Sequence, residues 1–205
     1  MEITLSPDNP EVNILHRLTN SGPWPIESAV WSITAMATGG KEVVPLTGRD
    51  TGLLPDRVIA LWPYTRLNDP RLIFGDKYII LKQDPNAQHP LKFGTSNENG
   101  WAAYFNHNHL FVKYYAHTVS ARYPDFGVSY ETYTADFMLE METLSPLTRL
   151  EPDTSVEHIE KWSLFDNVPM PSDDEDEIEK IINNRLCLCA SAPYFPLQFL
   201  PEPAE

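Results

Sequence analysis

Apolar and polar residues alternate in short runs along most of the chain, and Pro, Gly, Asn and Asp separate these runs. In residues 11–20, EVNILHRLTN, the alternation puts four side chains on one face: Val12, Ile14, His16 and Leu18. A period of two is that of a β-strand, whose successive side chains point to opposite faces. The turn-forming sequence SGPWP follows, and alternation returns in residues 26–37, IESAVWSITAMA. This pattern predicts a β-hairpin.

Further segments have the length of strands and are rich in Val, Ile, Thr, Tyr, Phe and Trp. They are residues 57–62, 77–82, 90–94, 100–105, 109–117, 128–142 and 155–165. Almost no helical periodicity separates them, and the 19 prolines suit strand ends and long connections. The pattern therefore predicts a mainly β protein, an antiparallel β-sandwich rather than a βαβ fold.

The pattern changes near residue 169, where a Pro-rich and acidic stretch begins. Apolar residues then stand at helical spacing: Ile178, Ile181, Ile182 and Leu186. Ser172 precedes an acidic run that suits the positive end of a helix dipole, so we predict a short helix over 173–188. The last residues combine aromatic side chains with prolines and have no period. We therefore expect a sandwich at 1–168, and an acidic linker, helix and extended tail at 169–205.

Charge and hydropathy limit the classes of partner. Against 15 Lys and Arg the chain has 29 Asp and Glu, a net charge of −14, which would repel a phosphate backbone. We therefore expect no nucleic-acid partner and no binding to anionic membranes. No apolar run reaches the length of roughly 18 residues that a spanning helix needs. The start, MEITLSPDNP, lacks the features of a secretory signal, which favours a cytoplasmic protein.

Two glutamates are the first candidates for chemistry. In FMLEME, residues 137–142, strand geometry puts Glu140 and Glu142 on one face, about 7 Å apart. If that face lines a cleft, repulsion between the carboxylates raises the pKa of one of them and makes a usable acid or base. If the face is open to solvent, the two glutamates have no such role. The pattern leaves both interpretations open.

Other reactive residues form weaker patterns. His107 and His109 stand two apart in NHNH, but this segment reads as a hairpin tip and lacks a third metal ligand. We predict no metal and no cofactor, and a metal hydrolase using the two histidines remains a distant alternative. Cys187 and Cys189 are too close for an unstrained disulfide, so we expect reduced thiols. The five tryptophans offer flat faces on which a pyranose can stack, although core filling explains most aromatic residues equally well.

Two long segments resemble a known family. Residues 12–46, VNILHRLTNSGPWPIESAVWSITAMATGGKEVVPL, resemble the central hairpin of galactose-mutarotase-like domains, with Asn-x-Gly before a Pro-containing turn. Residues 110–164 resemble the last strands of that superfamily: a Glu-bearing strand, LSPL, the turn LEPD and a strand with Glu-x-Trp. The resemblance covers residues 3–168 and is greatest to the DUF4380 group. It implies the supersandwich fold and a small carbohydrate as ligand.

The resemblance also implies roles for particular residues. Mutarotases open and close the sugar hemiacetal with a glutamate as base and a histidine as acid. The family's glutamate matches Glu140, with Glu142 as the alternative because the spacing to Pro146 does not settle the register. Trp31 stands where the family has its acid histidine, and an indole cannot exchange a proton near neutral pH. The resemblance therefore implies a sugar-binding cleft with an incomplete catalytic pair.

Four more residues are candidate ligand contacts around these glutamates: Trp31, Arg66, Lys113 and Asp125. The alternative is a non-catalytic structural or interaction module whose glutamates are solvated. The chain starts about where the second half of the family's fold begins, so we expect a sheet that the first half would cover. An exposed sheet edge attracts a second strand, which predicts a homo-oligomer.

Overall fold

The computed structural model describes residues 1–186, so Cys187, Cys189 and the predicted extended tail lie outside the described residues. The described part contains fifteen strands and one helix. The larger sheet contains, in spatial order, β1 (Glu2–Leu5), β2 (Glu11–Thr19), β15 (Ser155–Asp166), β11 (His109–Tyr115), β10 (Trp101–Asn106), β5 (Lys41–Pro45), β8 (Tyr78–Lys82) and β7 (Leu72–Phe74). The smaller sheet contains β4 (Trp31–Met36), β13 (Leu139–Leu144), β12 (Tyr130–Thr134), β9 (Leu91–Thr95) and β6 (Ile59–Leu61).

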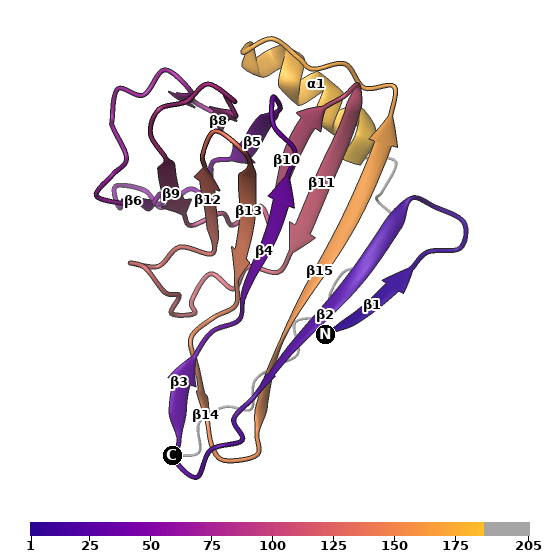
Figure 1. Ribbon diagram of the computed structural model, residues 1–205. Helices are drawn as coiled ribbons and strands as arrows, with labels where there is room; N and C mark the ends of the chain where they lie inside the picture. Colours follow the sequence, from indigo (N-terminus) through magenta and orange to yellow (C-terminus); the bar gives the residue numbers. More distant parts are fainter. Residues whose placement is uncertain (187–205) are drawn as a thin grey trace.

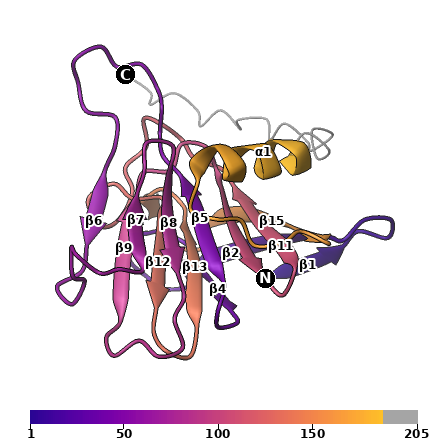
Figure 2. The same ribbon diagram turned by 90° about the horizontal axis from the view of Figure 1, so that it is seen from above.

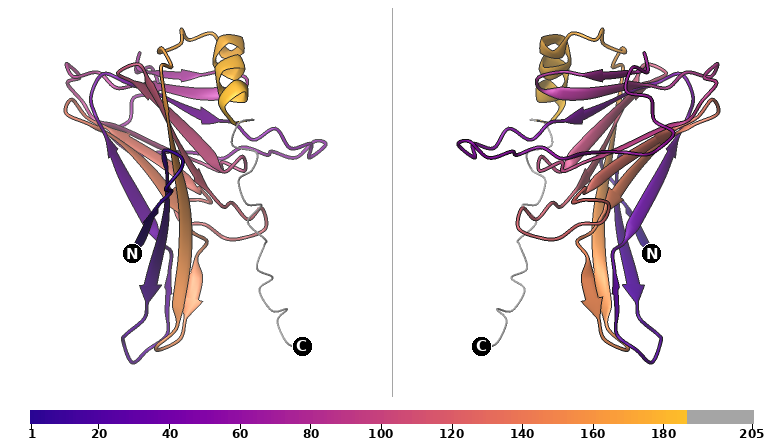
Figure 3. Two further views of the ribbon diagram at one scale, coloured as in Figure 1. Left: turned by 90° about the vertical axis from the view of Figure 1, so that its right-hand side faces the viewer. Right: turned by 90° about the vertical axis from the view of Figure 1, so that its left-hand side faces the viewer.

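The two sheets pack face to face, and Figure 1 shows the resulting sandwich with α1 (Glu175–Leu186) on one side. A third, two-stranded sheet joins β3 (Ile26–Ser28) to β14 (Thr148–Leu150). All pairings are antiparallel. The side views of Figure 3 show the β3–β14 pair at the end of the molecule away from α1. The predicted mainly β, antiparallel sandwich with a short C-terminal helix is confirmed.

The predicted hairpin of residues 11–20 and 26–37 is wrong. β2 pairs with β1 and β15, whereas β4 lies in the other sheet and pairs with β13. Between them the chain forms β3, whose partner β14 comes from more than a hundred residues later. The turn residues permit a reversal, but β2, β3 and β4 each pair with a strand from the C-terminal half of the chain: β15, β14 and β13.

The segment 128–142 is two strands rather than one. β12 and β13 form a hairpin, with the Ala135 N–H donating to the Met138 carbonyl across a two-residue turn of Asp136 and Phe137. Phe137 is 67% exposed at this tip. An apolar residue in a turn continues the alternating pattern, which is why the sequence alone does not reveal the reversal.

Apolar side chains fill both the space between the sheets and the space beneath the helix. Between the sheets, Phe93 and Met141 of the smaller sheet are fully buried against Ile79 of the larger one. On the opposite face of the larger sheet lies α1, as Figure 2 shows from above. Its Ile178 and Ile182 are buried in a cluster with residues of that sheet. Burying one such side chain stabilises the fold by about 1.5–3 kcal/mol. The layer between the sheets holds the smaller sheet against the larger one, and the other face of the smaller sheet points away from this core.

The helix lies within the predicted range, and its N-terminus is capped by Asp174. The Asp174 Oδ1 accepts hydrogen bonds from the N–H groups of Asp176 and Glu177, at 3.0 and 2.9 Å. Such a side-chain cap satisfies N–H groups that have no partner within the helix. The helix begins two residues later than predicted because Asp174, rather than Ser172, is the cap. Among the described residues there is no helix with the length and apolar character needed to cross a bilayer.

One buried ion pair of the larger sheet is hydrogen-bonded to the smaller sheet. Lys113 of β11 is fully buried, and its Nζ lies 2.8 Å from Oε1 of Glu160, which is also fully buried, on β15. The ammonium also donates to the Met141 carbonyl and to Thr34 Oγ1 of the smaller sheet, both at 3.0 Å. Burial lowers the pKa of Lys113, and the negative charge of Glu160 opposes that shift. Lys113 is therefore a polar link between the layers.

A buried acid lies in the same interior. The carboxyl group of Glu42 on β5 is fully buried, and the Tyr130 hydroxyl donates to its Oε1 at 2.5 Å. Burial raises the pKa of Glu42 to about 8, while the hydrogen bond from Tyr130 opposes the shift. In the unfolded chain Glu42 ionises near the ordinary pKa of a glutamate. At pH values between that pKa and the raised one, the folded protein therefore holds one proton more than the unfolded chain.

This extra proton predicts that stability falls as the pH rises through the Glu42 pKa. Between pH 6.5 and 9 we expect Glu42 alone to lower the free energy of unfolding by about 2 kcal/mol. Glu42→Gln removes the titration, so the stability of this variant should fall less over the same range. Urea unfolding at several pH values measures both curves. Parallel curves for the two proteins would contradict the assignment.

Candidate functional site

The candidate site lies on the outer face of the smaller sheet. On β13, alternate side chains enter the core, as Met141 does, while Glu140 and Glu142 point to the opposite face. A pocket of about 420 Å³ opens on this face. Six of the residues that line it are Trp31, Trp62, Lys92, Asp125, Glu131 and Leu144. They come from β4, β9, β12 and β13 and from two loops, so only the folded chain brings them together.

Lys92 connects the polar groups of the pocket. Its Nζ donates to Glu142 Oε2 at 2.7 Å and lies 2.8 Å from Glu131 Oε2. Glu131 and Glu142 are direct cross-strand partners on β12 and β13, and Lys92 is on β9, the other neighbour of β12. Two carboxylates directly opposite each other repel. The ammonium between them offsets that repulsion.

The same ammonium lies between two indole rings. Nζ of Lys92 is 4.9 Å from the ring centroid of Trp31 and 4.7 Å from that of Trp62. A cation over an indole face is attracted by the quadrupole of the ring. The Trp31 Nε1 also donates to Glu142 Oε2 at 2.5 Å, so the ring is fixed at both its face and its edge. Trp31 nevertheless stays 56% exposed and presents a flat apolar surface to the pocket.

Glu131 is a weak acid in this pocket. Burial raises its pKa to about 7, Lys92 opposes the shift, and the adjacent carboxylate of Asp125 raises the pKa further. Asp125 is placed there by a turn in which its own φ is +48°, a left-handed conformation that Asp tolerates better than most residues. A carboxyl group with a pKa near 7 can give or take a proton at neutral pH.

Two buried carboxylate oxygens at this site have no hydrogen-bond donor. They are Oε1 of Glu131 and Oε1 of Glu142, whose side chains are 2% and 0% exposed. The partner atom in each case, Oε2, is bonded to Lys92. An unpaired buried acceptor costs free energy. The site therefore has more acceptors than donors.

No protein-family model matches the chain, and no curated protein matches it in sequence. Among solved structures, a "putative aldose 1-epimerase" from Klebsiella pneumoniae subsp. pneumoniae superposes with a TM-score of 0.53 at 12% identity. The match covers 90% of this chain and 49% of that protein. The chain has the β-sandwich fold of the aldose epimerases.

A second structure shares this fold at 9% identity. It is a TPR-domain containing protein from Parabacteroides distasonis, with a TM-score of 0.51 over 82% of this chain and 30% of that one. The chain thus spans about half of the Klebsiella pneumoniae protein and less than a third of the Parabacteroides distasonis one. At these identities the shared property is the epimerase-like fold alone.

The fold brings three of the residues expected from the sequence to the pocket. Trp31 and Asp125 line it, and Glu142 is hydrogen-bonded to Trp31. Glu140 lies on the same face but is half-buried and does not line the pocket. Burial and the charge of Glu142 raise the Glu140 pKa. Of the two glutamates, Glu142 is the one bonded to residues that line the pocket, Trp31 and Lys92.

Two other expected residues lie apart from the pocket. Arg66 is exposed in the loop between β6 and β7, and Lys113 is buried between the sheets. The interior position of Lys113 follows from β11, whose alternate side chains Phe111, Lys113 and Tyr115 all face the smaller sheet. A lysine in an alternating strand is normally predicted to face solvent. Its burial here is explained by its ion pair with the buried Glu160.

Sequence reasoning missed Lys92 and Glu131, the groups at the centre of the pocket. Each alternates with a buried aromatic residue, Lys92 with Phe93 and Glu131 with Tyr130, and this was the available signal. The pattern gives the face of each residue within its own strand. It does not give the neighbouring strand, so their convergence on one ammonium could not be predicted.

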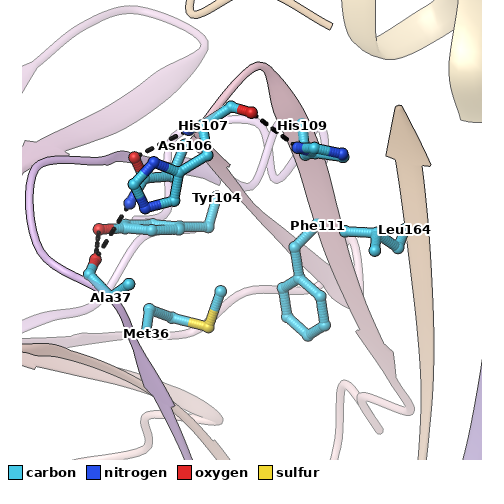
Figure 4. A pocket seen from close by; sticks show the side chains of 8 residues that line it. All are labelled: Met36, Ala37, Tyr104, Asn106, His107, His109, Phe111 and Leu164. Carbon is cyan, nitrogen blue, oxygen red and sulfur yellow. Dashed lines mark hydrogen bonds between the residues drawn. The ribbon is translucent and has the colours of Figure 1, made fainter. Parts of the chain in front are cut away.

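The two histidines of NHNH lie in a different place. His107 is in the β10–β11 turn, and His109 Nδ1 is 2.7 Å from the His107 carbonyl. Both border a mostly apolar pocket of about 280 Å³ with Met36, Phe111 and Leu164 (Figure 4). Within residues 1–186 there is no group of three His, Cys, Asp or Glu side chains that could hold a metal ion. The metal-hydrolase alternative gains no support from the described residues.

Proposed function

We propose that this protein binds a small carbohydrate in the pocket between Trp31 and Trp62. The observation that carries the proposal is that two indoles, one ammonium and the carboxyl groups of Asp125 and Glu131 line a single concave surface, with the buried Glu142 bonded to the same ammonium. A pyranose has apolar faces and a rim of hydroxyl groups, and this surface offers contacts for both. The epimerase-like fold supports the same ligand class by analogy.

The roles of the residues follow from their chemistry. The exposed ring of Trp31 stacks on a C–H face of the sugar, because Lys92 covers only one face of an indole. Glu131 and Asp125 accept hydrogen bonds from sugar hydroxyl groups. On binding, hydrogen bonds from these groups to the sugar replace their hydrogen bonds to water. The indole contact therefore supplies most of the free energy of binding, and the carboxyl groups supply selectivity.

Proton transfer on the bound sugar is the finer part of the proposal. Trp31 cannot replace the histidine acid expected from galactose-mutarotase-like domains, such as the DUF4380 group. Glu131 has a pKa of about 7 and is able to act as the acid, with Glu142 as the base. Polarimetry of freshly dissolved glucose or galactose measures this activity, and Glu142→Gln should abolish it if it is present.

Trp62 is the second indole of the pocket, and it can be removed without breaking the hydrogen bond between Trp31 and Glu142. We expect Trp62→Ala to weaken monosaccharide binding by about tenfold or more, because one aromatic wall of the pocket and its cation–π contact with Lys92 are both lost. Trp24→Ala is the matched control, since Trp24 is 75% exposed and does not line the pocket. Saturation-transfer NMR against a panel of hexoses and uronates measures the contact. Equal loss in both variants, or no contact by any sugar, would overturn the proposal.

A non-catalytic interaction module is the second candidate. Two phenylalanines at loop tips favour it: Phe126 is 93% exposed and Phe137 is 67% exposed. Phe126 adjoins Asp125 of the pocket, so a peptide rather than a sugar would then contact this surface. This candidate predicts that the sugar panel shows no contact with the wild-type protein.

A further inference from the structure

The pocket has a deficit of positive charge. Lys92 is the only cation among the residues that line the pocket, and it is already shared by Glu131 and Glu142. Asp125 adds a third carboxylate on the same surface. The formal charge of this group of four residues is therefore −2 when all of them are ionised. A ligand with a negative group would enter against this charge.

The positions of two unpaired atoms indicate where a further donor belongs. Oε1 of Glu131 and Oε1 of Glu142 are buried and receive no hydrogen bond, although each carboxylate is held by Lys92 through its other oxygen. A carboxylate oxygen accepts only, so neighbouring carboxylates cannot satisfy each other. The missing partner has to be a donor, and a cationic donor would also offset the surplus charge.

Three kinds of cation could supply that donor or charge. A proton is one, and burial favours it by raising the pKa of Glu131. A metal ion is another, but the described residues do not provide three side chains arranged to hold one. The third is an ammonium group on the ligand, which brings up to three N–H donors and is attracted by indole faces.

We infer that the preferred ligand of this pocket is an amino sugar with a free, protonated amine, bound beside Glu131 and Asp125. The inference rests on the proposed carbohydrate function and specifies the ligand class within it. The ammonium replaces the proton on Glu131, and the pyranose ring lies against Trp31. Neutral sugars bind more weakly because they leave the charge surplus in place, and uronates and sugar phosphates are excluded by it.

Calorimetric titration with a matched set of ligands tests this inference. Glucosamine is compared at pH 7 with N-acetylglucosamine, glucose and glucuronate, which share the ring but differ in charge. We expect glucosamine to bind about tenfold or more tightly than the two neutral sugars. Glucuronate should show no binding. The preference should shrink between about 50 and 500 mM salt, because screening weakens attraction between charges.

Variants separate the charge of the pocket from the charge of the whole protein. Glu131→Gln and Asp125→Asn should each reduce the ratio of glucosamine to N-acetylglucosamine affinity. Glu157→Gln is the control, since Glu157 is half-exposed on β15 and pairs with Arg17. It removes the same charge and should leave the ratio unchanged. Thermal unfolding of each variant verifies folding, and Asp125→Asn, in a surface turn, serves if Glu131→Gln unfolds.

The outcomes distinguish this inference from the proposed function. Equal binding of glucosamine and the neutral sugars would overturn the amino-sugar inference and leave carbohydrate binding in place. Binding of the neutral sugars with exclusion of glucosamine would do the same. No binding by any sugar would overturn both. A preference for glucosamine that survives in both pocket variants would place the amine elsewhere and overturn the inference.

Discussion

Replacing Lys113 with Met is expected to lower the free energy of unfolding by about 3–5 kcal/mol, among the largest effects that a single substitution could have here. The variant leaves the fully buried carboxylate of Glu160 without its cation. The Glu160 pKa is normally low, because hydrogen bonds from His16 and Lys113 and the positive charge of Lys113 outweigh burial. Loss of the ammonium reverses that balance. Urea unfolding at pH 7 measures the change.

A double variant distinguishes the cost of an unpaired charge from the loss of packing. Lys113→Met with Glu160→Gln removes both charges and keeps similar volumes, so we expect most of the lost stability to return. A coupling energy of about 2 kcal/mol or more between the two sites would confirm that the pair acts as a unit. If the single variant costs less than about 1 kcal/mol, Glu160 takes up a proton with little penalty and our account of the interior is wrong.

Replacing Lys92 with Met is expected to have the second largest effect, and this effect should depend on pH. Glu131 and Glu142 would then face each other on neighbouring strands with no cation between them. Repulsion would raise the folded-state pKa of Glu131 further above its value in the unfolded chain. Because a raised carboxyl pKa makes stability fall as the pH rises, we expect a loss of about 2–4 kcal/mol at pH 8 and a smaller loss at pH 5.

The same variant should lose sugar binding, since Lys92 positions both carboxylates and lies over both indole rings. Lys92→Arg is the control, because it keeps the positive charge and should retain most of the stability. Adding Glu131→Gln to Lys92→Met should restore stability at pH 8, as only one carboxylate is then left. A loss of stability that is the same at pH 5 and pH 8 would indicate a packing defect instead of charge repulsion.

The local pattern predicted the strands better than their partners. The segments 77–82 and 155–165 match β8 and β15 to within one residue, because alternation and turn residues act within a few positions. The reversal at Phe137 was missed because this exposed apolar residue continues the pattern. The predicted pairing of β2 with β4 failed for a different reason. Sheet membership depends on strands that are distant in the sequence.

The candidate site was also predicted only in part. Periodicity determined that Glu140 and Glu142 share one face of a strand, and the structure has them there. It could not determine that this face is a pocket, nor that Lys92 and Glu131 meet Glu142 in it. Lys113 was expected to contact the ligand in the cleft that the family resemblance implied, whereas the described structure buries it between the sheets.

The sequence by itself determined the strand character, the sandwich class, the acidic charge and the helix at the C-terminal end. These properties depend on composition and on the order of side chains along short segments, both of which the sequence contains in full. The tertiary structure decided which strands are neighbours, which carboxylates share an ammonium and which lysine is buried. Those properties depend on distances between residues far apart in the chain, and only the closing of the two sheets on their common core sets such distances.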